Sequence, residues 1–471
     1  MQPSELIKQN IPYTLTTEQD ELLLLLDTFI TAKNTQRSAF LIKGYAGTGK
    51  TMIISELVQV VKNFGYKTAL VAPTGRAAKV LASYSKKRAY TIHKKIYRQT
   101  DISGGGLVFQ RMPNVAENTI FIVDEASMIS DKAEFGKKSL LEDLISFVFS
   151  NIYANNKILF IGDNAQLPPV GETESPALQE DFLRTSYGLD ITFKQLTQVM
   201  RQEKESGILH NATQLRENIA QENYKLNFKT KGFKDFYKMT AERLEDGLVY
   251  AYNKYGAKNT IVVCRSNKTA NQYNQYIRKM IRGAEEEIEL GDLLMIVKNN
   301  YSVLQNEDDS IGFLANGDFV EIIKAGNVEE KYNLRFVTLT LRLLDYPDSE
   351  PFEAKVMLDT LYTNTPSLPQ EDYQKLMEAV KADYADITQV KKRNEALKAD
   401  LYMNALQVKF AYALTCHKSQ GGQWDAIFVE QGYLTDDNLN LEFLRWLYTG
   451  ITRATKEVFL VNFHERFFDN A

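Results

Sequence analysis

The chain has 471 residues, 44% of them hydrophobic and 25% charged, and its 25 glycines and 11 prolines are ordinary numbers for a folded protein. This composition excludes a collagen-like or wholly disordered chain, and the length predicts about two to four domains. The formal charge of −4 argues against a chain that coats nucleic acid over its whole surface, but it is compatible with a local basic groove.

Membrane and disulfide classes are excluded on similar grounds. No window approaches the roughly 18 consecutive apolar residues of a membrane span, and the first residues lack the features of a secretory signal. We therefore expect a cytoplasmic protein with no membrane partner. Cys264 and Cys416 lie far apart without a partner at zinc-ligand spacing, so both are predicted to be core residues.

Short apolar runs alternate with amphipathic stretches in the first third of the chain. These runs predict strands at Ala39–Lys43, Lys67–Ala72, Thr119–Val123 and Lys157–Ile161. Because the runs are apolar nearly throughout, they are typical of strands that helices cover on both faces, and we expect a largely parallel α/β sheet. The predicted helix after the first strand extends from Lys50 to Phe64.

A second group of apolar runs predicts another α/β domain. Its strands are expected at Thr260–Cys264, Phe410–Thr415, Ala426–Glu430 and Val458–Asn462. Between the two groups, residues 291–358 contain alternating apolar residues such as Val337, Leu339 and Leu341, which predict a small antiparallel β module. The following stretch to Asp400 is dense in mixed charge and is predicted to be a solvated helical insertion.

A phosphate-binding loop is predicted where the first strand passes into its helix. Gly44-Tyr45-Ala46-Gly47-Thr48-Gly49-Lys50-Thr51 matches the pattern G-x-x-x-x-G-K-[ST] in this strand-loop-helix context. The glycines allow backbone N–H groups to surround phosphate oxygens, and the start of the helix adds a positive dipole. Lys50 would reach the β and γ phosphates of ATP, and Thr51 would give its hydroxyl to Mg²⁺.

A pair of acidic residues follows another predicted strand. Asp124 and Glu125 come directly after Ile120–Val123. Asp124 would hold Mg²⁺, and Glu125 would orient or polarise the attacking water. Since a site that only binds nucleotide does not need Glu125, the pair indicates hydrolysis of ATP.

Further motifs lie around these two. They are, in chain order, Thr16–Gln19, Ala72–Ala78, Thr91–His93, Gly162–Val170, Leu196–Gln202, Tyr412–Gly421 and Tyr448–Ala454. In order and spacing, the motifs resemble those of superfamily 1 DNA helicases, most closely the RecD and Dda group, from about Leu15 to Asn462. One departure is Gly422-Gln423-Trp424, where RecD-like chains usually carry a Ser-Glu-aromatic sequence, and it leaves a ribose contact from Gln423 open.

The resemblance implies an α/β fold with two RecA-like parallel-sheet motor domains, a small β-hairpin insertion in the first and an SH3-like β insertion in the second. The first motor domain would span 1–195, with the hairpin at 97–118. The second would comprise 196–284 and 406–471, and 285–405 would hold the β module with its helical insertion. The implied activity is that of an ATP-dependent DNA helicase, with roles in DNA repair, recombination and replication.

The resemblance also implies roles around the nucleotide. Gln19 would contact the adenine, Gln166 would sense the γ phosphate, and Gly421 lies in a motif that contacts nucleotide. Arg201 and Arg453 would supply cations to the phosphates, Arg453 as the arginine finger, since a guanidinium makes bidentate contacts with phosphate oxygens.

By the same resemblance, a track for single-stranded DNA would run over both motor domains. Its expected contacts are Pro73, Thr74, Arg76 and His93 in the first domain and Thr415, His417, Lys418 and Ser419 in the second. Phe109 in the hairpin is either the apolar tip that stacks on the last base pair or an anchor for the base of the hairpin.

The expected partners are single-stranded DNA and forked or 5′-tailed duplex DNA, bound by a monomer that moves from 5′ to 3′. Two alternatives stay open. The chain is either the motor subunit of a helicase-nuclease complex or a nucleotide-switched DNA-binding ATPase that does not unwind.

Overall fold

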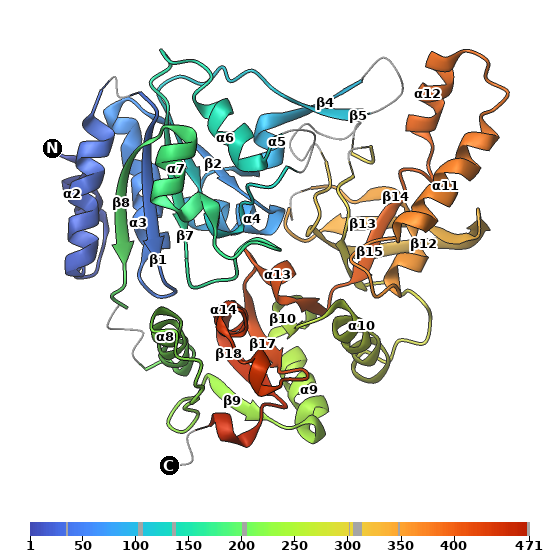
Figure 1. Cartoon of the computed structure of the whole chain (residues 1–471). Helices are drawn as coiled ribbons and strands as arrows, with labels where there is room; N and C mark the ends of the chain where they lie inside the picture. Colours follow the sequence, from blue (N-terminus) through green and yellow to red (C-terminus); the bar gives the residue numbers. More distant parts are fainter. Residues whose placement is uncertain are drawn as a thin grey trace.

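Two parallel sheets and a closed β-barrel form three neighbouring parts of the molecule, and the second sheet lies below the first in Figure 1. This computed structural model describes residues 1–33, 36–101, 107–133, 138–199, 205–300, 302–304, 313–346 and 349–468. The expected fold class is confirmed: α/β, with two parallel sheets and a separate β module.

The first sheet has the strand order β3-β2-β6-β7-β1-β8, and all its pairs are parallel. The strands are β1 (Ser38–Gly44), β2 (Lys67–Ala72), β3 (Ala89–Thr91), β6 (Thr119–Val123), β7 (Lys157–Gly162) and β8 (Asp190–Leu196). Each of the predicted strands is therefore present, and β6 is buried along its whole length, as its apolar sequence indicates.

Helices cover both faces of this sheet because alternate strand residues point to opposite sides. Phe40 and Ile42 of β1 belong to one core cluster, and Ala39 and Leu41 belong to the other. The first cluster includes α1 (Pro3–Asn10), α2 (Thr17–Thr31), α3 (Lys50–Val60) and α4 (Gly75–Ser85). The second includes α5 (Ile92–Ile96), α6 (Leu140–Val148) and α7 (Glu180–Tyr187).

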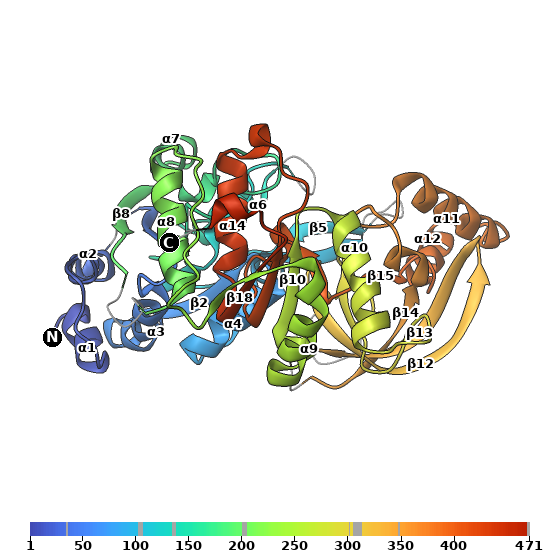
Figure 2. The same cartoon turned by 90° about the horizontal axis from the view of Figure 1, so that it is seen from below.

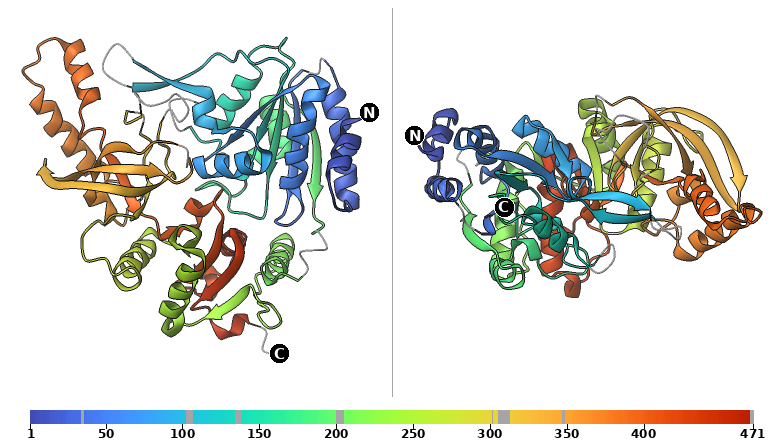
Figure 3. Two further views of the ribbon diagram at one scale, coloured as in Figure 1. Left: turned by 180° about the vertical axis from the view of Figure 1, so that it is seen from behind. Right: turned by 90° about the horizontal axis from the view of Figure 1, so that it is seen from above.

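An antiparallel hairpin extends from the first sheet. It consists of β4 (Tyr97–Asp101) and β5 (Leu107–Arg111), within the range predicted for the hairpin insertion. Figures 1 and 3 show that it points toward the side of the molecule that carries the barrel.

The second sheet has the order β16-β10-β17-β18-β9, again with parallel pairs. Its strands are β9 (Phe236–Met239), β10 (Thr260–Cys264), β16 (Ala413–Thr415), β17 (Trp424–Glu430) and β18 (Ala454–Val461). Its helices are α8 (Gly207–Ala220), α9 (Leu244–Tyr255), α10 (Asn267–Tyr276), α13 (Cys416–Ser419) and α14 (Leu441–Ile451). Both cysteines are free and buried in this part, which confirms them as core residues.

The predicted β module is a closed five-stranded barrel. It contains β11 (Leu293–Ile296), β12 (Phe319–Lys331), β13 (Leu334–Leu343), β14 (Phe352–Met357) and β15 (Leu406–Phe410). Figure 2 shows β12 and β13 as a long curved ribbon with the two insertion helices beside its far end. These helices, α11 (Gln370–Asp383) and α12 (Val390–Ala399), pack on the barrel through residues such as Leu376 and Val380 against Phe336.

One predicted strand was wrong. Phe410–Thr415 is not a single strand, because Phe410 ends β15 in the barrel and Ala413 begins β16 in the second sheet. The apolar sequence from Leu406 to Leu414 contains no turn signal that marks this passage. The barrel thus takes its last strand from 406–410, a range that the sequence assigned to the second motor domain.

Among the described residues, no helix is long and apolar enough to cross a membrane.

Candidate active site

The predicted phosphate loop connects β1 to α3. Gly47 and Gly49 have φ angles of 77° and 81°, in the left-handed region that glycine adopts at little cost. Gly49 is also the residue before the first turn of α3, so the loop ends at a helix N-terminus, whose free N–H groups favour phosphate oxygens.

The side chain of Lys50 lies across the phosphate loop. Its Nζ donates hydrogen bonds to the carbonyl oxygens of Gly44 and Tyr45, the second at 2.8 Å. A Cβ on Gly44 would lie 2.8 Å from Cδ of Lys50, so glycine leaves room for the lysine stem. Burial lowers the pKa of Lys50, and the carboxylates of Asp163, Glu125 and Asp124 partly offset this effect.

The acidic pair stands at the end of β6. Asp124 accepts a hydrogen bond of 2.5 Å from the hydroxyl of Tyr84, and Glu125 has a left-handed φ of 51°. Burial, followed by the charge of Glu125, raises the pKa of Asp124 to about 6. Tyr84 was missed by the sequence analysis, because a tyrosine on an amphipathic helix gives no signal for such a contact.

A cavity of about 770 Å³ brings the phosphate loop, the acidic pair and the second sheet together. Of the residues predicted to act on nucleotide, its walls include Ala46, Gly47, Thr48, Gly49, Lys50, Thr51, Asp124, Glu125, Gln166 and Arg453. Arg201 lies outside the described residues.

Arg453 enters this cavity from the second sheet. It follows α14 and precedes β18, is 6% exposed, and donates a hydrogen bond of 3.1 Å from Nη1 to Oε1 of Glu125. Its Nε and the Oε1 of Gln166 are buried with no hydrogen-bond partner among the described residues. Unpaired donors and acceptors of this kind are costly, and a bound phosphate with its attacking water would satisfy both.

Other side chains of the second sheet also contact the first across the cavity. The hydroxyl of Tyr448 accepts from the N–H of Ala46 at 2.9 Å and donates to Oδ2 of Asp163 at 2.7 Å. The hydroxyl of Thr449 accepts from the N–H of Leu167 at 2.9 Å. Gln420 donates to the carbonyl of Leu167 at 2.8 Å. The phosphate loop and the Gly162–Val170 motif are therefore held directly by the second sheet.

Three residues predicted to contact nucleotide, Gly44, Gln19 and Gly421, do not line the cavity, and Gly44 packs against the stem of Lys50 instead. Gln19 is 0% exposed, and its amide donates to the carbonyl of Thr48 at 3.0 Å and accepts from the N–H of Thr16 at 2.9 Å. Gln19 therefore stabilises the phosphate loop through Thr48 and does not face the cavity. Gly421 lies against α4, where a Cβ would be 2.7 Å from that of Ala77, and Gln423 lines the cavity instead.

The predicted DNA contacts of the first sheet lie around the start of α4 and in α5. Thr74 caps α4 by accepting from the N–H of Ala77 at 3.2 Å, and Pro73 precedes it. His93 is half-buried in α5, with its ring 5.7 Å from that of Tyr97. Arg76 points from α4 to two aromatic rings of other parts of the molecule.

The predicted DNA contacts of the second sheet lie in and beside α13. Thr415, His417 and Lys418 are partly exposed. The Nζ of Lys418 has no hydrogen-bond partner in the described part of the chain, and burial together with nearby Lys409 lowers its pKa to about 8.

Two predicted DNA contacts differ from the others. Ser419 is 0% exposed and its hydroxyl donates to the carbonyl of Cys416, so it closes α13 and does not face a track. Phe109 lies in β5 opposite Gln99, and its side chain is outside the described part of the structure.

Magnesium fits the residues present. Thr51 offers an exposed hydroxyl and Asp124 a half-buried carboxylate in the same cavity, and both are oxygen ligands of the kind that Mg²⁺ prefers. In the described ranges, no group of three or more His, Cys, Asp or Glu side chains could hold a metal alone.

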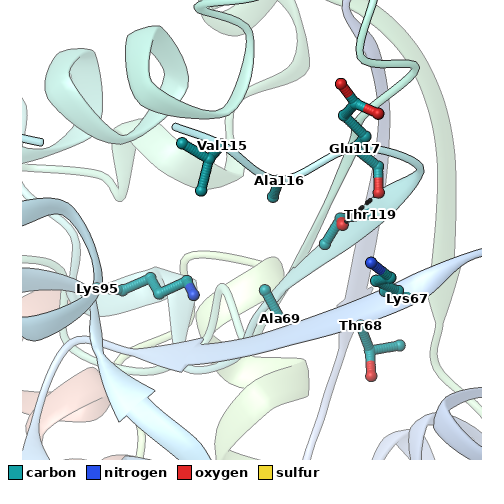
Figure 4. Close-up of a pocket in the computed structure, with 8 residues that line it drawn as sticks. All are labelled: Lys67, Thr68, Ala69, Lys95, Val115, Ala116, Glu117 and Thr119. Carbon is teal, nitrogen blue, oxygen red and sulfur yellow. Dashed lines mark hydrogen bonds between the residues drawn. The ribbon is translucent and has the colours of Figure 1, made fainter. Parts of the chain in front are cut away.

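A smaller pocket of about 310 Å³ lies elsewhere on the first sheet (Figure 4). Lys67 and Thr119, the first residues of β2 and β6, line it together with Lys95. Because the phosphate loop follows the last residue of the parallel strand β1, this pocket is at the opposite edge of the sheet and is separate from the nucleotide cavity.

Two parallel sheets that share one phosphate-loop cavity, with an arginine of one sheet paired to the acidic residue of the other, define a nucleotide-hydrolysing motor. Residues 26–230 match the family described as AAA domain, and residues 410–461 match the UvrD-like helicase C-terminal domain.

Relatives match nearly the whole chain. The ATP-dependent DNA helicase dda of Enterobacteria phage T4 is 26% identical, over 89% of this chain and 93% of its own. The RecBCD enzyme subunit RecD of Buchnera aphidicola subsp. Schizaphis graminum is 24% identical, over 90% of this chain and 70% of its own. A solved structure of two coordinating Pif1 helicases at forked double-stranded DNA has a TM-score of 0.49 and 15% identity, over 98% of this chain and 95% of that one. The chain belongs to the superfamily 1 helicases, in the group of RecD and Dda.

Proposed function

We propose that this protein is an ATP-dependent DNA helicase that moves from 5′ to 3′ on single-stranded DNA and separates duplex strands. The observation that carries the proposal is the contact between Arg453 and Glu125 in the cavity that also holds Lys50. Since the catalytic groups come from two sheets, hydrolysis is coupled to the relative position of the sheets. The relatives named as DNA helicases support DNA as the nucleic-acid substrate. The polarity is proposed from the resemblance of the motifs to those of the RecD and Dda group.

In this proposal the phosphate loop holds ATP, with Lys50 on the β and γ phosphates and Thr51 and Asp124 as ligands of Mg²⁺. When bound, the ion neutralises charge on the phosphate oxygens. Glu125 orients the attacking water, Gln166 senses the γ phosphate, and Arg453 stabilises the charge that develops on transfer. Arg453 and Glu125 form a pair in the structure, so Arg453 must exchange this contact for the phosphates in order to act on ATP.

The proposed DNA track uses Pro73, Thr74 and His93 beside the first sheet and Thr415, His417 and Lys418 beside the second. Lys418 is the strongest member, because its ammonium is partly buried without a partner in the described part of the chain, and a DNA phosphate would supply one. The hairpin of β4 and β5 is proposed to separate the strands, with Phe109 of β5 as the apolar group that stacks on the last base pair. The chain is proposed to act as a monomer inside the cell.

A forked-duplex assay tests the proposal. We expect ATP-dependent release of a strand from a 5′-tailed duplex, little release from a 3′-tailed duplex, and stimulation of hydrolysis by single-stranded DNA. Lys50→Ala is the matched control: it should abolish hydrolysis and unwinding but leave DNA binding, since it removes the phosphate partner and not the track.

Other outcomes select the alternatives. Equal release from both tails would reject the polarity. DNA-stimulated hydrolysis without strand release would favour a nucleotide-switched DNA-binding ATPase. Release that appears only after a partner is added would favour a motor subunit like the one that the RecD relative is named for.

A further inference from the structure

One arginine connects all three parts of the molecule. The guanidinium carbon of Arg76, in α4 beside the first sheet, lies 4.4 Å from the ring centre of Phe319 in the barrel. It also lies 4.1 Å from the ring centre of Trp424 in the second sheet. Both distances are within the range of a cation–π contact, and the two rings approach each other to 6.3 Å. A residue predicted to contact DNA is therefore occupied by protein.

Gly422 leaves the space for the contact between Arg76 and Trp424. A Cβ on Gly422 would lie 2.4 Å from Cη2 of Trp424 and 3.1 Å from Cδ of Arg76. Trp424 is 3% exposed, so its ring has no room to move aside. This gives a physical reason for Gly422 at the position where RecD-like chains usually carry serine.

A buried carboxylate lies next to the arginine. Asp318 precedes Phe319, is 2% exposed, and its Oδ2 accepts from the N–H of Ala315 at 2.7 Å. Its Oδ1 has no hydrogen-bond partner among the described residues and lies against Gly75, the first residue of α4, where a Cβ would be only 2.1 Å away. Burial raises the pKa of Asp318 to about 7, so near neutral pH the side chain is in part a carboxylate. A negative group is favourable at a helix N-terminus, which is also where a DNA phosphate would bind.

We propose that the barrel edge formed by Asp318 and Phe319 is an internal competitor of single-stranded DNA at the start of α4. The Asp318 carboxylate takes the place of a DNA phosphate, and the Phe319 ring holds Arg76 away from the strand. The inference rests on the proposed function, because it uses the proposed DNA track at Thr74 and adds Arg76 to that track once the barrel edge has moved away. The strand must displace the barrel edge before it can lie on α4.

The competition predicts the direction of change in DNA affinity. If only the open form binds DNA, the apparent Kd equals the intrinsic Kd divided by the open fraction. A substitution that weakens the barrel edge therefore tightens binding, although it removes a native contact. Loss of one cation–π contact should lower the Kd by about 2- to 30-fold.

The test measures the Kd for a labelled oligothymidylate strand without nucleotide. Phe319→Leu keeps an apolar side chain and all charges but removes the aromatic ring, so a lower Kd reports release of Arg76. Asp318→Asn should lower the Kd as well. The matched controls are Phe336→Leu, where the barrel packs against α11, and Asp372→Asn, on the exposed surface of α11, and neither should change the Kd.

A second measurement, the fluorescence of Trp424, reports directly on the contact between Trp424, Phe319 and Arg76. The chain has two tryptophans, so Trp446→Phe leaves Trp424 as the single reporter. Saturating oligothymidylate should shift its emission to longer wavelength as the ring becomes exposed to water. If Phe319→Leu does not fold, this measurement decides alone.

The two measurements distinguish a failure of the competition from a failure of the proposed function. An unchanged or higher Kd in a folded Phe319→Leu, or an unshifted emission maximum with bound DNA, overturns the competition and leaves the helicase proposal intact. Failure of the unsubstituted chain to bind any single strand overturns the proposed function instead.

Discussion

Tyr448 places a single hydroxyl on both the phosphate loop and Asp163, from the opposite side of the nucleotide cavity. Tyr448→Phe should leave buried Asp163 with the N–H of Ala165, at 2.9 Å, as its remaining hydrogen-bond donor among the described residues. We expect the free energy of unfolding to fall by about 1–3 kcal/mol. DNA-stimulated hydrolysis should fall too, because the contact between the sheets is loosened. Urea denaturation and a steady-state ATPase assay measure both, and Tyr433→Phe, at an 86% exposed tyrosine, should change neither.

Asp124 gives the site a pH dependence. Its pKa is raised to about 6, so the side chain is a carboxylate above that pH and a neutral acid below it. Because Mg²⁺ needs the carboxylate, affinity for Mg²⁺ with a non-hydrolysable ATP analogue should weaken as pH falls from 7 to 5. Calorimetric titration measures this, and Asp124→Asn should bind weakly with a flatter profile.

The same raised pKa acts on folding with the opposite sign. Because the folded chain holds the Asp124 proton more tightly than the unfolded chain, this group stabilises the fold most at acid pH. Its contribution is lost as pH rises through about 6. Acid should therefore weaken the affinity for Mg²⁺. Any loss of folding stability in acid must come from groups other than Asp124.

At the scale of elements, a buried ion pair fastens the barrel to the second sheet. Arg278, just after α10, contacts Asp292, just before β11, at 2.8 Å, with side chains 6% and 0% exposed. The hydroxyl of Tyr412 donates to the same carboxylate at 2.8 Å. Arg278→Ala would leave Asp292 buried without its main partner, and we expect a loss of about 3–5 kcal/mol in urea denaturation. Lys375→Ala breaks an exposed pair with Asp372 and should cost at most about 1 kcal/mol.

Long apolar strands were predictable from sequence, and short ones were not. β6 and β10 have the predicted bounds, because helices bury both faces and every residue is apolar or small. β3 and β9 have three and four residues, too few for a periodic pattern, and they form because a neighbouring strand supplies the hydrogen bonds. The division of Leu406–Leu414 between two sheets depends on tertiary pairing alone.

The site was predictable where spacing along the chain carries the chemistry. Lys50, Asp124 and Glu125 follow strands directly, and the motif that contains Arg453 led to the same cavity. Gln19 and Gly421 were placed in that cavity by the same resemblance, but packing against Thr48 and Ala77 directs them elsewhere. Tyr84 and Tyr448 contact Asp124 and Asp163 only because the fold brings distant parts of the chain together, and no local sequence pattern predicts such contacts.

At the scale of the whole molecule, the net charge of −4 means that DNA must be held by a few local cations. The logarithm of the Kd for a single strand should therefore rise linearly with the logarithm of salt concentration. Lys418→Ala should weaken binding at every sequence and reduce that slope by about 0.7, the value for one phosphate contact on a single strand. Lys375→Ala on exposed α11 is the control and should leave the slope unchanged.

Only Ala411 and Tyr412 separate the last strand of the barrel from the edge strand of the second sheet. Two residues span roughly 7 Å when fully extended, too short for a free swivel. A barrel that swings away from α4 must therefore pull on β16 and on the short helix α13 that follows it. Gln420, the residue after α13, donates a hydrogen bond to the carbonyl of Leu167 beside the nucleotide cavity. The connection through Ala411 and Tyr412 would thus transmit a displacement of the barrel by a DNA strand to the nucleotide cavity.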